Sequence, residues 1–357
     1  MNTDCDFMRA ALAEARKGLG RTAPNPPVGA VIVKDGQIVG RGFHPKAGEP
    51  HAEIFALRAA AEQARGATCY VTLEPCSHWG KTPPCAEALI SAGVSRVVAG
   101  MPDPNPLVAG RGLEILEEAG IEIVVGVEEQ ACRELTRWYT HWMQTKRPYV
   151  IVKTAQTIDG CIATPSGDSK WITGEAARQQ VHALRDQVDA ILVGASTVLA
   201  DDPQLNCRLA GGRDPLRVIL DRDYEVPAAA KVLGPDCLIL TAAEPASRPE
   251  ILASGTTVER LELDAAGRFD WQAVLELLGA RGLHALLIEG GSRVLGSLFE
   301  AGLVNRWQAY VAPKLLGCGK PLVSMAAPEL MSMAQRFKLV NLARVGQDAL
   351  LEMEPED

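Results

Sequence analysis

One histidine, one glutamate and two cysteines in the first half of the chain have the types and spacing of a metal site. His51 and Glu53 open an expected helix, and Cys76 and Cys85 follow further along the chain. One imidazole and two thiolates are the three protein ligands expected of a catalytic zinc ion, whose fourth position is left for water. Zinc lowers the pKa of that water toward about 7. Glu53 would take the water's proton and pass it to a leaving amine.

A structural zinc ion is the alternative interpretation of the same residues. Such an ion would need a fourth protein ligand, and His44 or His78 could supply it. Cys85 follows two prolines and opens an expected helix, where unpaired N–H groups lower the pKa of a thiol and favour the ligating thiolate. The pattern favours the catalytic ion, one per chain.

The elements around these residues are those of an α/β domain. We expect an opening helix over residues 6–17 and a hairpin of residues 28–34 and 37–43, because Asp35-Gly36 is a strong turn signal. Further short strands and helices follow, and a long helix ends near Met143. The hairpin makes the predicted sheet of this three-layer unit mixed rather than purely parallel.

A polar, proline-containing segment at residues 144–148 predicts a linker, after which the alternation of strands and helices restarts. We therefore expect two domains, residues 1–146 and 147–357. The second domain has no Gly-x-Gly-x-x-Gly motif. Gly290 and Gly291 instead lie between an expected strand and an expected helix, where they could cradle a pyrophosphate or form a plain tight turn.

The composition narrows the possible partners and location. The chain has 357 residues, with 36 Lys and Arg against 44 Asp and Glu, and a net charge of −8. Proteins that bind nucleic acid normally have a basic face, so we expect no nucleic-acid partner. No apolar stretch approaches the roughly 18 residues of a membrane span, and the N-terminus is acidic where a secretory signal would be basic. The nine cysteines are an odd number. Without a signal peptide they predict a cytoplasmic protein rather than a disulfide framework.

The motifs resemble one family in detail. His-x-Glu followed by Pro-Cys is the zinc deaminase signature. The long spacing from Cys76 to Cys85 is the pattern of the bifunctional deaminase–reductases of bacterial riboflavin biosynthesis. The resemblance includes residues 24–29, 47–53 and 103–112. It implies a cytidine-deaminase-like three-layer α/β/α domain that removes the 2-amino group of a diaminopyrimidinone ribosylamine phosphate by zinc-dependent hydrolysis.

The second half resembles the reductase of the same family at residues 153–160, 169–173, 194–203 and 311–317. The resemblance implies a dihydrofolate-reductase-like α/β domain that uses NADPH. This domain would reduce the ribosylamino group to a ribitylamino chain by hydride delivery to the sugar's C1. The resemblance also implies small-molecule phosphoribosylaminopyrimidine substrates and a homo-oligomer.

Matching positions imply further site residues. The deaminase substrate would contact Asn25, His44, His78 and Lys81. NADPH would contact Ala155, Trp171, Thr197, Asp201, Gly291, Ser292, Arg293, Val294, Leu295, Gly296 and Ser297. The reductase substrate would contact Lys153, Ser169, Arg185, Leu205, Arg208 and Glu289. Arg185 and Arg208 could clamp the terminal phosphate. Glu289 could bind sugar hydroxyls.

Several alternatives stay open. Lys153 could assist proton transfer or be a structural ion-pair partner, and Trp171 could be a core residue. Arg222 stands where many relatives have Ser, and it could pair with a 2′-phosphate or be solvated. A nucleic-acid base deaminase and a zinc-stabilised nucleotide sensor are the competing function classes. The acidic composition and the second domain count against the base deaminase.

Overall fold

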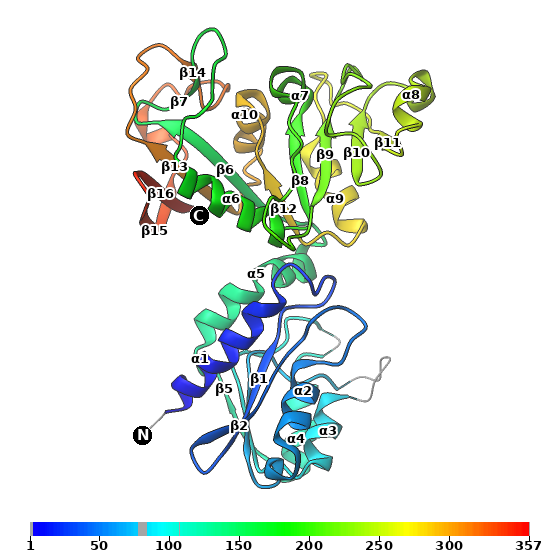
Figure 1. Ribbon diagram of the computed structural model, residues 1–357, viewed down its shortest axis with the longest axis vertical. Coiled ribbons are helices and arrows are strands. Elements are labelled where there is room, and N and C mark those ends of the chain that lie inside the picture. The colour runs from blue at the N-terminus through cyan, green and yellow to red at the C-terminus, as the bar shows by residue number, and fades with distance from the viewer. Residues whose placement is uncertain (1–2, 78–83, 107, 357) are drawn as a thin grey trace. The chain divides into compact units, whose positions relative to one another are not determined.

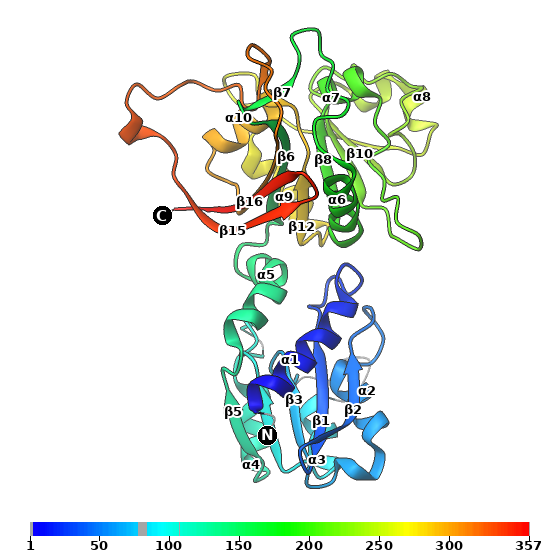
Figure 2. The same ribbon diagram turned by 60° about the vertical axis from the view of Figure 1, so that its left-hand side comes forward.

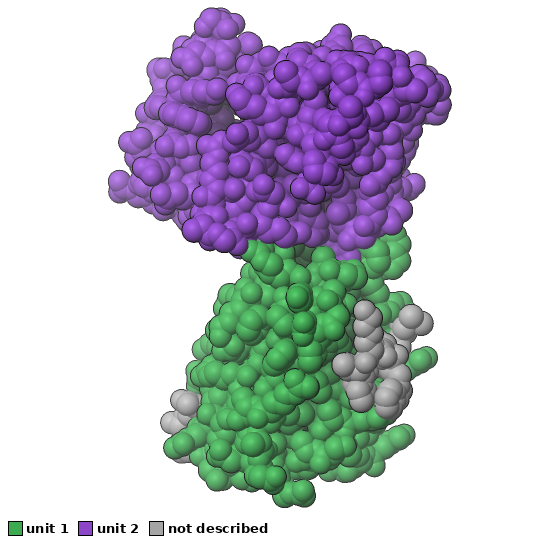
Figure 3. Space-filling view, turned by 45° about the vertical axis from the view of Figure 1, so that its right-hand side comes forward, with its two compact units in different colours: residues 1–146 green, residues 147–357 purple. Residues whose placement is uncertain are grey.

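The computed structural model describes residues 3–77, 84–106 and 108–356. The chain divides into two compact units, Met1–Lys146 and Arg147–Asp357 (Figure 3). The division falls within the polar segment 144–148. Each unit has its own main sheet and its own hydrophobic core. Among the described residues, none of the helices has the length and apolar composition needed to cross a bilayer.

The first unit is built on a five-stranded sheet in the order β2-β1-β3-β4-β5. Its strands are β1 (Gly29–Lys34), β2 (Gln37–Phe43), β3 (Thr68–Val71), β4 (Arg96–Ala99) and β5 (Glu122–Val125). Its helices are α1 (Asp4–Ala15), α2 (Ala52–Ala60), α3 (Cys85–Ser91), α4 (Arg111–Glu118) and α5 (Glu129–Thr145), with short 3-10 turns η1 (Arg16–Gly18) and η2 (Ala61–Ala64). β1 pairs antiparallel with β2 and β3, whereas β3, β4 and β5 are parallel, so the predicted mixed sheet is confirmed.

Helices cover both faces of this sheet (Figure 1). Alternate residues of a strand point to opposite faces. Ala30 and Ile32 therefore lie in a core with α2, α3 and α4, while Val31 and Val33 lie in a core with α1 and α5. Asp35 and Gly36 form the predicted hairpin turn, with φ angles of 50° and 73°. The expected helix that opens at His51 and Glu53 ends at Ala60, because Ala61 adopts a φ of 48° and a 3-10 turn follows.

The second unit is built on a nine-stranded sheet in the order β11-β10-β9-β8-β12-β6-β13-β16-β15. Its strands are β6 (Tyr149–Thr157), β8 (Ala190–Gly194), β9 (Leu216–Leu220), β10 (Cys237–Thr241), β11 (Thr257–Arg260), β12 (Ala285–Ile288), β13 (Arg306–Ala312), β15 (Phe337–Val345) and β16 (Asp348–Pro355), and β7 (Cys161–Ala163) pairs separately with β14 (Lys320–Pro321). The helical elements are α6 (Glu175–Gln187), α7 (Ala195–Asp201), α8 (Pro249–Leu252), α9 (Trp271–Ala280), α10 (Ser292–Glu300), η3 (Pro245–Ser247) and η4 (Met331–Met333). Helices α9 and α10 pack on one face of the sheet, and α6 packs against β13, β15 and β16.

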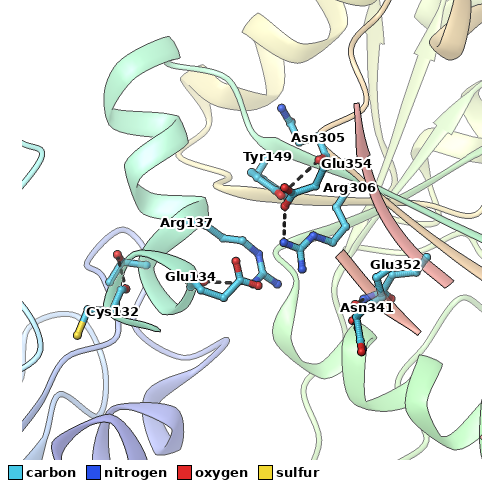
Figure 4. Close-up of polar contacts among 11 residues, drawn as sticks. Cys132, Glu134, Arg137, Tyr149, Asn305, Arg306, Asn341, Glu352 and Glu354 are labelled. Carbon is cyan, nitrogen blue, oxygen red and sulfur yellow. Dashed lines mark hydrogen bonds and ion pairs between the residues drawn. The ribbon is translucent and has the colours of Figure 1, made fainter. Parts of the chain in front are cut away.

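The C-terminal hairpin β15–β16 extends this sheet and was not expected from the sequence (Figure 2). β16 pairs antiparallel with β13, whereas the other neighbours from β11 to β13 are parallel. Polar side chains also join these strands. Arg306 on β13 forms an ion pair with Glu354 on β16, and Asn341 on β15 donates to Glu352 at 2.8 Å (Figure 4). The helix α7 and the edge strand β11 were likewise not expected.

Candidate active sites

Three side chains from three separate segments meet in the first unit. His51 is the N-cap of α2, Cys76 lies in the loop after β3, and Cys85 is the first residue of α3. Their ligating atoms all lie within 4.8 Å of one another. Nδ1 of His51 is 3.5 Å from Sγ of Cys76 and 3.3 Å from Sγ of Cys85.

These distances fit a tetrahedral zinc ion. Zn–S bonds of about 2.3 Å and Zn–N bonds of about 2.1 Å would place a nitrogen ligand about 3.6 Å from each sulfur ligand. The hydrogen bond with the Cys85 thiol and the neighbouring His51 imidazole together lower the pKa of Cys76 to about 4. The backbone N–H of Cys85 also donates to Sγ of Cys76, at 3.3 Å. Cys76 is therefore a thiolate at neutral pH, which is the form that binds metal.

Glu53 lies on the first turn of α2 with only 3% of its surface exposed. Its carboxyl group is close enough to interact with the Cys85 thiol and the His51 imidazole. Burial raises the pKa of Glu53. Among the described residues, its Oε2 atom is buried and has no hydrogen-bond partner. Leaving a buried carboxylate oxygen unpaired is costly, so the arrangement suits a polar ligand that the described residues do not supply.

His44 does not provide a fourth metal ligand. Its Nδ1 is 3.1 Å from the carbonyl oxygen of Pro50, and its Nε2 is 3.0 Å from Nδ2 of Asn25. Because a carbonyl only accepts, Nδ1 donates and Nε2 accepts from Asn25. Burial lowers the pKa of His44. Both ring nitrogens are occupied, which disfavours a structural zinc ion held by His44. His78 and Lys81 lie outside the described residues.

A cavity of about 170 Å³ opens beside the metal-binding group. Among the predicted site residues, Asn25, His44, His51, Glu53 and Cys76 line it. The structure thus brings the predicted substrate residues that it describes to the same cavity as the predicted metal ligands. The other lining residues are Pro26, Val28, Leu73, Glu74, Asp103, Asn105, Val108 and Tyr139.

Sequence reasoning missed four polar residues of this cavity. Asp103 and Asn105 belong to the segment 103–112, which carried the family resemblance but was assigned no role. Glu74 directly precedes Pro75-Cys76, and Tyr139 comes from α5. The hydroxyl of Tyr139 donates to Oδ1 of Asp103 at 3.2 Å. The motif could have indicated the first two residues, but no local signal points to Tyr139.

A buried ionic cluster occupies the second unit. Arg185 on α6 donates two hydrogen bonds to the carboxylate of Glu289, at 2.9 and 3.0 Å. Nζ of Lys153 on β6 lies 3.7 Å from the same carboxylate. Burial alone would raise the pKa of Glu289, but Arg185 and Lys153 together lower it to about 2. Lys153 is therefore an ion-pair partner in this structure.

Close packing requires a glycine at position 290, just after β12. A Cβ atom on Gly290 would lie 2.6 Å from Cγ1 of Val294, and one on Gly194, at the end of the neighbouring strand β8, would lie 2.8 Å from Cγ2 of the same side chain. Thr197 on α7 lies against Gly291, since a Cβ there would be 3.4 Å from its Oγ1. The ends of two parallel strands thus meet the first turn of α10, where the first N–H groups have no intrahelical partner and can bind phosphate.

The remaining predicted cofactor residues differ in their surroundings. Leu295 is in the core, and Ser297 accepts a hydrogen bond from the Trp271 indole at 2.9 Å, so both side chains face the interior. Trp171 is 60% exposed and is therefore not a core residue; the Arg178 guanidinium lies 4.6 Å from its ring centre. The other predicted positions are Ser292, Gly296 and Ala155, which are not exposed, and Arg293 and Asp201, which are exposed.

The predicted reductase substrate residues include one arginine available to an anion. Arg208 is exposed, and within the described chain it has no hydrogen bond or ion pair. The charges of Arg185 and Arg208 both lower the pKa of His182, after burial, so the two arginines lie near the same histidine. Leu205 is buried with a φ of 54°, and Ser169 is half-buried. Arg222 forms an exposed ion pair with Asp223 at 2.7 Å.

Two family models match the chain. Residues 1–101 match the cytidine and deoxycytidylate deaminase zinc-binding region, and residues 148–351 match the RibD C-terminal domain. With the fold and the metal-binding group, these matches define a zinc-binding deaminase domain joined to a reductase domain. The α/β fold class and the cytidine-deaminase-like first domain predicted from the sequence are confirmed.

Relatives and solved structures resemble the chain over nearly its whole length. It is 44% identical to the riboflavin biosynthesis protein RibD of Actinobacillus pleuropneumoniae, over 98% of this chain and 95% of the relative, and 41% identical to that of Escherichia coli K12, over 97% and 98%. The structure of Acinetobacter baumannii RibD covers 99% of each chain at 43% identity and a TM-score of 0.90. A Thermotoga maritima diaminohydroxyphosphoribosylaminopyrimidine deaminase/5-amino-6-(5-phosphoribosylamino)uracil reductase covers 99% of each chain at 40% identity and a TM-score of 0.88. The chain belongs to the RibD family of bifunctional deaminase–reductases of riboflavin biosynthesis, the family that the sequence motifs indicated.

Proposed function

We propose that the first unit hydrolyses an amino group from 2,5-diamino-6-(5-phosphoribosylamino)pyrimidin-4-one, and that the second unit reduces the deaminated product with NADPH. The observation that carries this proposal is the group of three ligating atoms within 4.8 Å of one another. Beside them lies the buried Oε2 of Glu53, which has no hydrogen-bond partner in the described part of the chain. The names of the Thermotoga maritima relative supply the substrate class. In this assignment, residues 1–146 form the deaminase domain and residues 147–357 the reductase domain.

In the deaminase domain, His51, Cys76 and Cys85 would hold the zinc ion. Zinc supplies a Lewis acid that activates water for attack on the carbon that carries the amino group. Glu53 takes a proton from this water and delivers it to the departing amine, so that water is consumed and ammonia leaves. Its burial raises its pKa, and a raised pKa suits a carboxyl group that must both accept and release a proton near neutral pH.

The cavity residues would orient the pyrimidine and its ribose phosphate. The hydrogen bond from Asn25 holds His44 as a neutral ring, and the carbonyl of Asn25 can accept from a substrate amino group. His78 and Lys81 are proposed to contact the substrate on the basis of the family motif alone. Lys81 would contribute a positive charge for the phosphate.

In the reductase domain, NADPH supplies the hydride. The first turn of α10, from Gly291 to Val294, would bind the pyrophosphate through its N–H groups. Thr197 beside Gly291 supports a dinucleotide site here. Trp171, Ala155, Asp201 and residues 295–297 complete the proposed set. Arg208 would bind the substrate phosphate. Glu289, held in place by Arg185 and Lys153, would accept hydrogen bonds from sugar hydroxyls, and Ser169 and Leu205 would line the same site.

The proposal also includes a cytoplasmic location and a homo-oligomeric state. None of the nine cysteines forms a disulfide, which supports a reducing compartment such as the cytoplasm. The edge strand β15 exposes Leu339 and Leu342, at 50% and 64%. An apolar edge strand is a natural pairing surface, which supports a homo-oligomer.

One assay tests both activities. The full chain is loaded with zinc and given the diaminopyrimidinone substrate with or without NADPH, while ammonia release and NADPH absorbance are followed. We expect ammonia release without NADPH, and NADPH oxidation only after deamination has begun. NADPH oxidation without any ammonia release, or no reaction at all, would contradict the proposal.

A further inference from the structure

Glu74 uses its carboxylate to hold a distant loop. Only 4% of its surface is exposed. Its Oε2 accepts hydrogen bonds from the backbone N–H groups of Asp103 and Gly110, at 3.1 and 2.9 Å, and its Oε1 accepts from that of Gly112 at 3.0 Å. Both oxygens are therefore bound to backbone groups. The mechanism above assigns no role to this residue.

The segment that Glu74 holds forms part of the deaminase cavity. We call residues 103–106 and 108–112 the cavity-wall loop, because Asp103, Asn105 and Val108 line the cavity. Oδ1 of Asp103 accepts from the backbone N–H of Asn105 at 2.8 Å and from the hydroxyl of Tyr139 at 3.2 Å. The carboxylate of Glu74 is thus the point at which both ends of this loop are fixed.

A second contact fixes the same loop against the metal-binding segment. A Cβ atom on Gly112 would lie 1.9 Å from the carbonyl oxygen of Pro75 and 3.3 Å from Oε1 of Glu74. The start of α4 therefore packs directly on the residue between Glu74 and Cys76. A shift of the loop relative to this segment would change the distance between the substrate-facing side chains and the metal ligands.

We propose that Glu74 is a positioning residue of the deaminase, which holds the cavity-wall loop in register with Cys76 and thereby sets the affinity for the pyrimidine substrate. This inference rests on the proposed function of the cavity. Glu74 is not a catalytic residue, because its oxygens accept bonds from the backbone and are not available to carry protons. Its loss should affect substrate binding more than metal binding or the chemical step.

The variant Glu74→Gln tests this proposal. A carboxamide keeps one acceptor oxygen, and its NH₂ group would face a backbone N–H that it cannot bind. We expect the KM of deamination to rise about 10-fold or more, as for the loss of a charge-assisted hydrogen bond, with kcat within about threefold of wild type. Zinc content and reductase activity should be unchanged. Hydrogen–deuterium exchange should increase in residues 103–112.

A matched control is Glu14→Gln. Glu14 is also buried, at 6% exposure, but it pairs with Lys17 and Arg41 and does not line the cavity. The variant Glu14→Gln should leave the KM of deamination and the hydrogen–deuterium exchange of residues 103–112 unchanged. If Glu74→Gln lowers the yield of folded protein, Gly112→Ala provides the second variant, since its new Cβ would displace the same loop, and it should raise KM similarly.

Three results would overturn the proposal: an unchanged KM in both variants, unchanged exchange in residues 103–112 of Glu74→Gln, or loss of zinc as the primary effect. Failure of the proposed function is recognised separately. In that case the wild-type chain releases no ammonia from the diaminopyrimidinone, whereas the exchange of residues 103–112 still reports whether Glu74 holds the loop.

Discussion

In the first unit, Oε2 of Glu53 is buried beside three metal-ligating atoms and has no partner among the residues that the structure describes. In the second unit, the carboxylate of Glu289 accepts two hydrogen bonds from Arg185 and faces Lys153. The first arrangement becomes complete only when a metal ion and a polar ligand bind. In the second arrangement, Arg185 and Lys153 already balance the charge of the Glu289 carboxylate, and the three side chains hold one another in place.

This difference explains how each site would work. In the deaminase site the unpaired carboxylate is free to move a proton, because no group of the described chain competes for its outer oxygen. In the reductase site the hydride comes from the cofactor, so the charged residues serve to hold and orient. Variants that remove one carboxylate from each unit should therefore have different consequences, catalytic in the first and structural in the second.

Glu53→Gln should produce the largest effect. We expect kcat for ammonia release to fall about 10²- to 10⁴-fold, because the proton carrier is lost, while zinc remains bound and the reductase activity is retained. The measurement is ammonia release together with zinc content. Glu62→Gln, an exposed glutamate on η2, serves as the control. If Glu53→Gln turns over at the wild-type rate, Glu53 does not carry the proton.

Glu289→Gln should mainly destabilise the second unit. Removing one partner from a buried ion pair leaves an uncompensated charge, and we expect the free energy of unfolding to fall by about 3 kcal/mol at pH 7. Urea unfolding of the full chain measures this change. Glu276→Gln, which removes an exposed ion pair with Arg147, should cost less than about 1 kcal/mol.

A comparison of the wild-type chain with Glu289→Gln at different pH values gives a further test of the ion pair. The pKa of Glu289 is held at about 2 in the folded chain, below its ordinary value of 4.5. The ionised carboxylate therefore stabilises the fold above pH 4.5, and this stabilisation is lost as the pH falls toward 2. The difference between wild type and Glu289→Gln should be constant from pH 7 to pH 5 and should shrink below pH 4.5. A difference that grows on acidification would contradict the ion-pair account.

Arg208→Ala should have a smaller and more selective effect. Arg208 is exposed and unpaired within the described chain, so we expect its loss to affect the proposed substrate binding rather than the fold. We expect the KM of the reductase step to rise about 10-fold, as for the loss of one charged hydrogen bond, with deamination unchanged. Arg268→Ala, which removes an arginine paired with Glu300, is the control. Equal damage to both activities would show that the two sites are not independent.

The two sites also differ in how far the sequence could predict them. The residue types of His51, Cys76 and Cys85 already limit the chemistry to soft-metal binding, and the structure brings these three side chains together. Glu289 carries no such signal, because a glutamate after a strand can do many things. Its partners come from β6 and α6, and the family resemblance alone pointed to it. Contacts such as those of Glu74 were also hidden, since their donors are backbone N–H groups.

In the fold, the sequence predicted the elements with strong local signals. The Asp35-Gly36 turn and the opening helix of the first unit are confirmed, because turn residues mark the one and an apolar face marks the other. The hairpin β15–β16 was missed for a physical reason. Most residues of β15 are exposed on both faces of this edge strand, so the strand lacks the alternation that reveals a half-buried strand. Its register depends on pairing with β16.

X-ray absorption at the zinc edge, combined with zinc content, tests the central claim most directly. For the wild-type chain we expect one zinc ion per chain with one nitrogen, two sulfur and one light-atom ligand, and Cys85→Ser should remove a sulfur from this set. A zinc-free protein that still releases ammonia, or an ion held by four protein ligands, would contradict the account.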